Sequence, residues 1–201
     1  MRDARLRHCV LALAVALPIV AACTADRERT SAERFEPLRY DYLPPIRLNV
    51  AAISVEQRYV PASTGDDLTK LDPVAPADAI RAMAEDRLKP LGTTGRAVLA
   101  INDATVARAA DGLEGSADVR LDIYGPSDER VAFADARVSA RRAGDGGGQR
   151  RGLYELTKAL VDQLNVELEY QVRHNLRDWV VTAQDALPAP VQQRDLPAPA
   201  R

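Results

Sequence analysis

Cysteine and histidine are the scarcest reactive residues in this 201-residue sequence, with two of each. Cys9, Cys23 and His8 lie near the N-terminus, which leaves His174 as the one imidazole in the rest of the chain. A catalytic Ser–His or Cys–His pair and a His/Cys zinc site are therefore not expected, and His174 is predicted to be solvated or to face a partner. The sequence predicts no catalytic residue, no metal site and no cofactor.

The sequence also lacks an excess of basic charge. It contains 27 Lys and Arg residues against 29 Asp and Glu residues, and residues 1–22 hold three of the arginines and one of the aspartates. The remaining chain then has 24 basic and 28 acidic residues, a net charge of −4. Such an acidic chain argues against nucleic-acid binding.

Apolar runs long enough to cross a bilayer are lacking as well. The run at residues 9–22 follows Arg2, Arg5 and Arg7 and ends in small residues, which is the arrangement of a secretory signal peptide. Its fourteen residues fall short of about 30 Å of hydrocarbon as a helix, and Pro18 interrupts them. A permanent transmembrane helix is therefore the weaker interpretation.

The signal segment ends in Val20-Ala21-Ala22-Cys23, which resembles the lipobox of bacterial lipoproteins: an aliphatic residue, two small residues and a cysteine. The resemblance implies cleavage before Cys23, a diacylglyceryl group on its thiol and an acylated amino terminus. Several acyl chains anchor a protein stably, where one chain binds only marginally. The alternative is an ordinary signal peptide followed by a chance cysteine.

Position 24 and the segment after it bear on location. In the sorting rule known for many such lipoproteins, an Asp after the cysteine retains the protein at the inner membrane. Thr24 therefore predicts the periplasmic side of the outer membrane, with the inner membrane as the less expected location. Residues 23–45 are charged and punctuated by proline and are interpreted as a lipidated terminus and spacer. Two alternatives stay open: either part of the spacer lies along the domain, or all of it is disordered.

Residues 46–182 are predicted to form one α+β domain, followed by a disordered Pro/Ala-rich tail at 183–201. Alternation of apolar and polar residues predicts strands, and apolar residues at helical spacing predict helices. A slip in the alternation of the first strand indicates a bulge or burial on both faces. The expected elements are a strand at 46–60, a helix at 76–91 with Met83 in the core, strands at about 96–107, 117–124 and 129–140, and a helix at about 152–182.

The two strands around the turn at 125–128 each have one polar side, which is typical of an antiparallel sheet with one wet face. We therefore predict a two-layer β-α-β-β-β-α fold with an antiparallel or mixed sheet and both helices on one face. The last helix would extend about 45 Å. Its far end either overhangs the domain and offers a partner surface or packs on the spacer.

This element order, together with the lipobox, resembles small periplasmic lipoproteins that serve as auxiliary components of envelope lipid transporters or of lipopolysaccharide assembly. The resemblance covers about 135 residues and includes no diagnostic motif, so it concerns the fold more than the function. It implies membrane attachment through the lipid and an envelope protein as partner.

Arg141, Arg142, Arg150 and Arg151 surround the glycine-rich run 143–149 and form a candidate anion-binding site. Guanidinium groups make forked hydrogen bonds to phosphate, so anionic lipid headgroups or lipopolysaccharide phosphates are the candidate ligands. The alternative is a mobile charged connector. A P-loop is not expected, because its closing Lys-Ser/Thr is missing.

Two acidic pairs, Asp66 with Asp67 and Asp118 with Asp122, have the residue types of an acid/base pair. Acidic residues are mostly exposed, so surface solvation is predicted for both pairs. The leading functional hypothesis is a non-enzymatic adaptor that contacts a membrane machine through its sheet edge or long helix. The second is a protein that binds a lipid or small hydrophobic ligand in an apolar cavity between sheet and helices. The third is an envelope hydrolase with a carboxylate site.

Overall fold

The computed structural model describes residues 34–60, 66–144 and 149–182. The predicted signal peptide, Cys23 and the C-terminal tail lie outside these residues. All the helices and strands below belong to one compact unit, which begins at Phe35.

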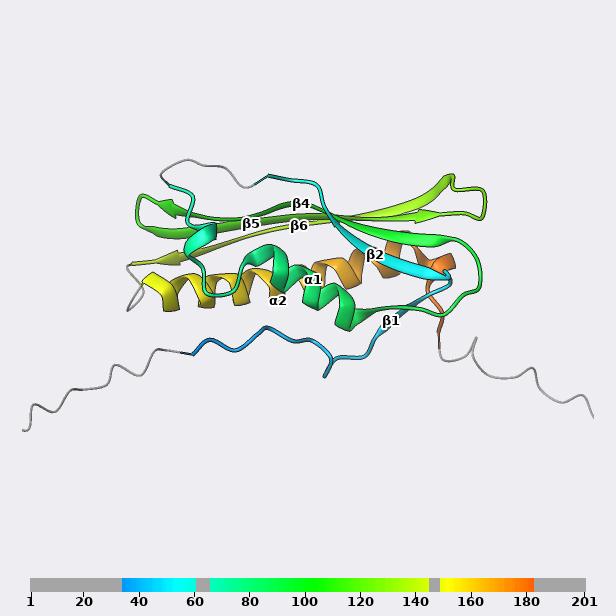
Figure 1. Cartoon of the computed structure of the whole chain (residues 1–201), viewed down its shortest axis with the longest axis horizontal. Helices are drawn as coiled ribbons and strands as arrows, with labels where there is room; N and C mark the ends of the chain where they lie inside the picture. Colours follow the sequence, from blue (N-terminus) through cyan, green and yellow to red (C-terminus); the bar gives the residue numbers. More distant parts are fainter. Residues whose placement is uncertain (1–33, 61–65, 145–148, 183–201) are drawn as a thin grey trace, which may run out of the picture. The chain divides into compact units, whose positions relative to one another are not determined.

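A four-stranded sheet in the order β2-β4-β5-β6 forms one layer of this unit (Figure 1). β2 pairs with β4 in parallel, and β4, β5 and β6 are antiparallel neighbours. Short connections join the three antiparallel strands, so consecutive strands lie side by side. The strands are β2 (Ala52–Gln57), β4 (Arg96–Ala109), β5 (Gly112–Tyr124) and β6 (Arg130–Ala143).

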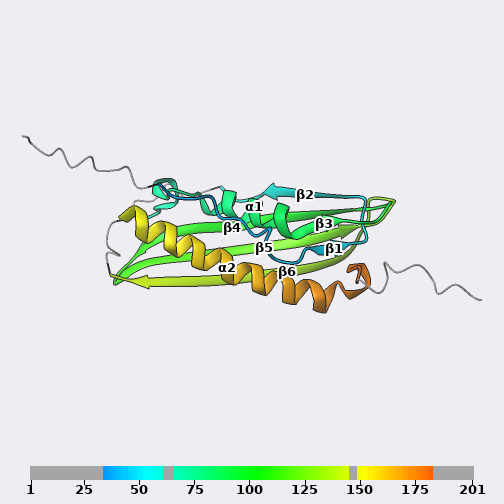
Figure 2. The same ribbon diagram turned by 90° about the horizontal axis from the view of Figure 1, so that it is seen from below.

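Two helices cover the same face of this sheet (Figures 1 and 2). α2 packs mainly on β6 and β5, and α1 packs on β4 and α2. The strands β1 and β3 form a second, parallel two-stranded sheet. The predicted α+β class, with a mixed sheet and both helices on one face, is confirmed. The remaining elements are β1 (Ile46–Leu48), η1 (Thr69–Leu71), α1 (Pro76–Arg87), β3 (Leu88–Pro90), α2 (Gln149–Asn175) and η2 (Arg177–Trp179).

Small residues on the sheet allow α2 to lie close to it. Ala117, Ala134 and Ala136 face the helix and are at most 1% exposed. A Cβ at position 115 would lie 3.3 Å from Leu160 Cδ2, so Gly115 fits the close approach of the helix. Met83 is buried in the same core, as predicted. The α2 stripe in this core consists of Leu153, Leu156, Leu160, Val161, Leu164, Leu168 and Val172, and Leu176 follows it.

The strand predicted at 46–60 is two strands in different sheets, so that prediction is wrong. β1 pairs with β3, whereas β2 pairs with β4. Between them, the Val50 N–H donates to the Leu48 carbonyl and the Ala51 N–H donates to the Thr94 carbonyl. The slip in alternation therefore marks a bend from one sheet to the other, and neither a bulge nor burial on both faces.

The first helix ends earlier than predicted. The prediction extends it to Leu91, but α1 ends at Arg87 and the next three residues form β3. Pro90 disfavours a helical conformation at Lys89, the residue before it, which accounts for the early end.

The second helix also ends early, because α2 stops at Asn175 rather than near residue 182. After η2 the chain turns back onto β1. The Asn49 N–H donates to the Trp179 carbonyl at 2.8 Å, and the Val181 N–H donates to the Arg47 carbonyl at 2.9 Å. The end of the apolar stripe thus packs beside β1, so it neither overhangs the domain nor lies on the spacer.

Candidate functional site

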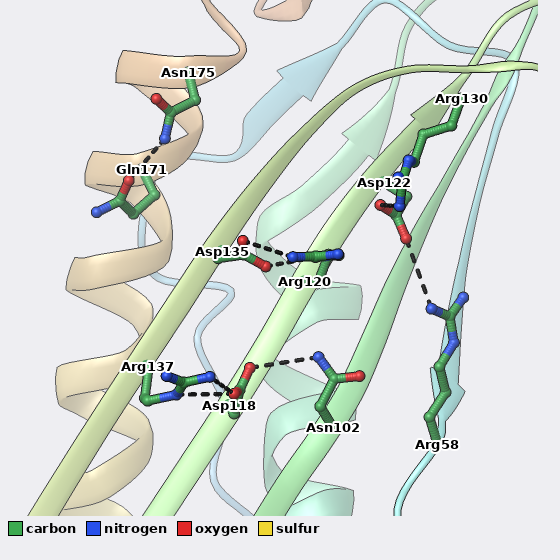
Figure 3. Close-up of polar contacts among 10 residues, drawn as sticks. All are labelled: Arg58, Asn102, Asp118, Arg120, Asp122, Arg130, Asp135, Arg137, Gln171 and Asn175. Atoms are coloured by element: carbon green, nitrogen blue, oxygen red, sulfur yellow. Dashed lines mark hydrogen bonds and ion pairs between the residues drawn. The ribbon is translucent and has the colours of Figure 1, made fainter.

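The face of the four-stranded sheet that the helices leave open carries charged side chains (Figure 3). Odd-numbered residues of β5 between 113 and 123 face the helices, so even-numbered ones face outward. The cross-strand register then sets Arg120 opposite Asp135 and Asp118 opposite Arg137. Opposite charges at such positions stabilise an antiparallel pair. We call this surface the open sheet face; its residues are Arg58, Asn102, Asp118, Arg120, Asp122, Arg130, Phe133, Asp135 and Arg137.

Asp122 is the buried centre of the open sheet face. Its side chain is 1% exposed, with Oδ2 3.7 Å from Nη1 of Arg58 and Oδ1 3.5 Å from Nη1 of Arg130. Surface solvation, which the sequence predicted for Asp122, is therefore wrong. Two guanidinium groups compensate this buried carboxylate, and a buried charge without such partners would be strongly destabilising.

Next to Asp122, Arg120 and Asp135 form a forked ion pair. Nε and Nη2 of Arg120 donate to the two carboxylate oxygens of Asp135 at 2.6 and 2.9 Å. The hydrogen bond with Asp135 is the main reason that the pKa of Arg120 is raised. The guanidinium also lies 4.8 Å from the ring centroid of Phe133, within the range of a cation–π contact. Arg120 is therefore held in one orientation from two sides.

Asp118 forms the third pairing of the open sheet face. Its Oδ2 accepts a hydrogen bond from Nε of Arg137 at 2.9 Å, and its Oδ1 accepts one from the Asn102 amide at 3.4 Å. By residue type, Asp118 and Asp122 are candidates for an acid/base pair. In the structure, the two are bound to different arginines. The two carboxylates therefore do not converge on a shared position, as the two groups of an acid/base pair would.

The open sheet face offers an incoming surface a fixed set of groups. It presents forked N–H donors, carboxylate acceptors and the ring of Phe133, which is 48% exposed. Arginine and aromatic residues are enriched where proteins bind one another. Its four arginines are nearly balanced by three aspartates, so the face suits a polar protein surface better than a polyanion.

Part of the predicted spacer packs on the helices, which favours the first of its two alternatives. Leu38 and Tyr40 are buried, and residues 35–45 run along the side of the helices away from the sheet (Figure 1). Arg39 binds Asp86 on α1 through Nε at 2.8 Å and Nη2 at 2.6 Å, and the Tyr40 N–H donates to Asp86 at 2.8 Å. These contacts, the Arg39 hydrogen bond first, lower the pKa of Asp86. We call residues 35–45 the strap.

A second buried contact ties the strap to both helices. Arg87, 1% exposed, donates through Nε to Oδ1 of Asn165 at 2.8 Å. Its other nitrogens donate to the Pro44 carbonyl and to Glu169. One signal of this contact is present in the sequence, because Asn165 is a polar residue beside the apolar stripe of α2. Arg87 itself looked like an ordinary basic residue at a helix end.

The arginines before the glycine-rich run point to opposite faces of β6. Arg141 lies on the outward side, with Nη2 3.5 Å from Glu114. Arg142 lies on the helix side, with Nη2 2.7 Å from Glu155 on α2. Strand alternation therefore separates two residues that are neighbours in the sequence.

The arginines after the run lie in the first turn of α2. Nη1 of Arg151 is 3.9 Å from Glu155, and the Arg150 guanidinium lies 5.8 Å from the ring centroid of Phe35. The structure thus brings Arg142 and Arg151 together at Glu155 and sets Arg141 apart, while residues 145–148 lie outside the described residues. Anion binding by these arginines stays a prediction.

The other acidic pair is solvated only in part. Asp66 is exposed, whereas Asp67 is partly buried: its Oδ1 accepts a hydrogen bond from the Thr69 N–H at 2.9 Å, and its Oδ2 is buried without a hydrogen-bond partner among the described residues. His174 is exposed on α2 and stacks on Tyr170, with ring centroids 5.9 Å apart. Within the described residues, no group of three or more His, Cys, Asp or Glu side chains could hold a metal ion. No helix in this part of the chain is long and apolar enough to cross a bilayer.

The surface hollows lie away from the core. One is at the β4–β5 connection and the start of α2, and one of about 740 Å³ lies between β6 and the end of α2. Another lies on the outward side of the sheet near Ser116 and Ser139. Between the sheet and the helices, residues such as Leu121, Leu156 and Leu160 are at most 2% exposed, so the interface is filled by side chains.

No protein-family model matches the sequence, and no curated protein matches it. Solved structures that align with the chain include a hypothetical protein from Chlamydia trachomatis, with 10% identity over 63% of this chain and 98% of that one and a TM-score of 0.40. A minor lipoprotein from Acinetobacter baumannii aligns with 15% identity over 61% and 93% of the two chains and a TM-score of 0.31. A DUF330 protein from Xanthomonas campestris aligns with 9% identity over 68% and 97% and a TM-score of 0.31.

Proposed function

We propose that this chain is a lipid-anchored lipoprotein on the periplasmic side of the bacterial outer membrane. There it serves as a non-enzymatic adaptor or auxiliary subunit of an envelope transport or assembly machine. The anchor is supported by the lipobox that ends at Cys23. The adaptor role rests on one observation, which is the exposed sheet face of ordered arginine–aspartate pairs around Phe133.

The chain between Cys23 and the strap limits how far the domain lies from the membrane. Phe35 packs against Tyr154 of α2 with the rings tilted by 47° and their centroids 5.1 Å apart, and the Tyr154 hydroxyl donates to the Glu36 carbonyl at 3.1 Å. With the lipid on Cys23, the twelve residue steps to Phe35 span at most about 40 Å. The open sheet face therefore meets partners that are in the membrane or close to it.

A carrier of a lipid or small hydrophobic ligand is less well supported. Such a protein needs an apolar space large enough for the ligand, of the order of 300 Å³ or more. The layer between sheet and helices is instead filled by buried side chains, among them Leu121 and Leu160. An envelope hydrolase ranks last, because Asp118 and Asp122 are each held by arginine.

The anchor is tested by substituting Cys23→Ser in the full chain and separating membranes after a salt and carbonate wash. The variant is expected to leave the membrane fraction, because it has no thiol to carry the lipid. Thr24→Ser, which keeps the lipobox, serves as the matched control and is expected to stay. Retention of the Cys23→Ser chain with the washed membranes would contradict the lipid anchor.

The adaptor role is tested by crosslinking in cells followed by mass spectrometry. The native chain is expected to yield one reproducible envelope protein, and the double variant Arg120→Gln/Phe133→Ala is expected to lose it while remaining folded and membrane-bound. Lys70→Glu, an exposed change away from the open sheet face, is expected to keep the partner. Recovery of no reproducible partner, or equal recovery with the double variant, argues against the role.

A further inference from the structure

The two edges of the four-stranded sheet are protected to different degrees. β2 is six residues long, and Nη1 of Arg81 donates to the Val55 carbonyl at 3.0 Å, which covers part of that edge. β6 is fourteen residues long. Along its free edge, the side turned away from β5, its backbone N–H and C=O groups form no backbone hydrogen bond to another element within the described residues. A long edge of unpaired N–H and C=O groups is a template for another strand.

The outward side chains of β6 are complementary to themselves. Phe133, Asp135, Arg137, Ser139 and Arg141 alternate along this side of the strand. In an antiparallel pair of two β6 strands centred on Ala136, Asp135 of each copy faces Arg137 of the other. A pair centred on Asp135 or on Arg137 would instead set like charges opposite each other, which is destabilising.

The same register extends the existing pattern of charges across the junction. Arg120 already binds Asp135, and Arg137 already binds Asp118. Pairing the two β6 strands at Ala136 forms a row of side chains across four strands. The row begins with Arg120 and Asp135 of one copy and continues with Arg137 and Asp118 of the second copy. Charge alternates at every step, so no existing ion pair needs to break.

The shape of the edge also accommodates a second strand. The hollow of about 740 Å³ beside β6 is lined, from β6, by Arg130, Val131, Ala132, Phe133 and Asp135 and, from α2, by Gln171 and Asn175. Figure 3 shows α2 with these two amides on the outer side of β6. In the register centred on Ala136, residues 137–142 of the second copy run alongside Arg130–Asp135 and enter this hollow. Val131 and Phe133, which are 45% and 48% exposed, would be covered in part.

We propose that β6 pairs antiparallel with β6 of a second copy, with Ala136 on the twofold axis, so that two four-stranded sheets join into one sheet of eight strands. A closed twofold contact of this kind uses the same edge of both copies and leaves neither β6 edge free. The pairing does not depend on the proposed adaptor role. It doubles the open sheet face and leaves the β2 edge, with Arg58, away from the junction.

The test uses two charge reversals in the full, lipidated chain, purified in detergent with two different tags. Asp135→Lys places Lys opposite Arg137, and Arg137→Asp places Asp opposite Asp135. Each variant alone is expected to self-associate at least about tenfold more weakly than the native chain, since two attractive contacts become repulsive. A one-to-one mixture of the variants is expected to restore association, because both contacts are attractive again in the mixed pair.

The mixture separates loss of pairing from loss of folding, since a misfolded variant is not rescued by another variant. Lys70→Glu is the matched charge reversal away from β6 and is expected to associate like the native chain. Sedimentation equilibrium measures the association, and a native chain that is monomeric, unaffected variants or a mixture that fails to associate each overturn the proposal. Photo-crosslinking from position 139 in cells is expected to join two copies; capture of another protein alone would assign this edge to that protein's strand and equally overturn it.

Discussion

The two faces of the four-stranded sheet use the same strands for different purposes. On the helix side, Ala134, Leu121 and Leu160 belong to one buried core, and burial of apolar area contributes about 25 cal/mol per Å². On the open side, half-exposed pairs such as Arg120 with Asp135 contribute little, because solvent screens them. Stability therefore resides mainly on the helix side, which leaves the open sheet face free to specialise in recognition.

A cavity on the helix side is expected to lower the free energy of unfolding more than any change on the open sheet face. Leu160→Ala is expected to lower the free energy of unfolding by about 2–5 kcal/mol, because the packed surroundings, Gly115 included, cannot fill the space. Val166→Ala on the same helix, at a position that is 68% exposed, is the control and is expected to change it by less than about 0.5 kcal/mol. Urea denaturation measures both. Equal effects would show that α2 does not pack as described.

The strap gives the helix side a pH dependence. The pKa of Asp86 is lowered, chiefly by the Arg39 hydrogen bond, so its contribution is full above the unfolded-state pKa of about 4 and is lost as pH falls through the folded-state pKa. Asp86→Asn is expected to destabilise the protein by about 1.5–3 kcal/mol at pH 7. The difference from the native chain should shrink below about pH 4. Denaturation at pH 7 and pH 3 tests this; a difference that persists unchanged at pH 3 would exclude the carboxylate as its source.

Asp122 belongs to the open sheet face but is buried like a residue on the helix side. Asp122→Asn is expected to cost about 1 kcal/mol, less than a core cavity, since Arg58 and Arg130 are 42% and 50% exposed and regain water. Thermal unfolding measures the loss. Asp128→Asn, which removes an exposed partner of Arg96, is the control and is expected to have little effect.

Local periodicity predicted both faces of the sheet. The alternation in β5 and β6 and the leucine stripe of α2 gave the α+β class, the single wet face and most of the core. The bend between β1 and β2 was missed, because a slip in alternation looks the same for a bulge, a two-sided strand or a change of sheet.

The buried charged groups were missed because their partners are distant in the sequence. Asp122 meets Arg58 only because β2 pairs with β4 and β4 with β5. Arg87 meets Asn165 and Glu169 only where α1 crosses α2. No spacing rule within one element encodes such contacts, whereas the pairing of β5 with β6 follows from one short turn.

The smallest effect on stability is expected at Arg120, where the largest effect on recognition is also expected. Arg120→Lys keeps the charge but loses the forked hydrogen bonds to Asp135, so the free energy of unfolding should fall only slightly, because solvent screens this exposed pair. If the open sheet face binds a protein, the same change removes a fixed planar donor at the centre of the contact and should weaken partner recovery several-fold. Lys158→Arg on α2, outside that face, is the control for both measurements. A variant that lost stability but kept its partner would reverse the assignment of the two faces.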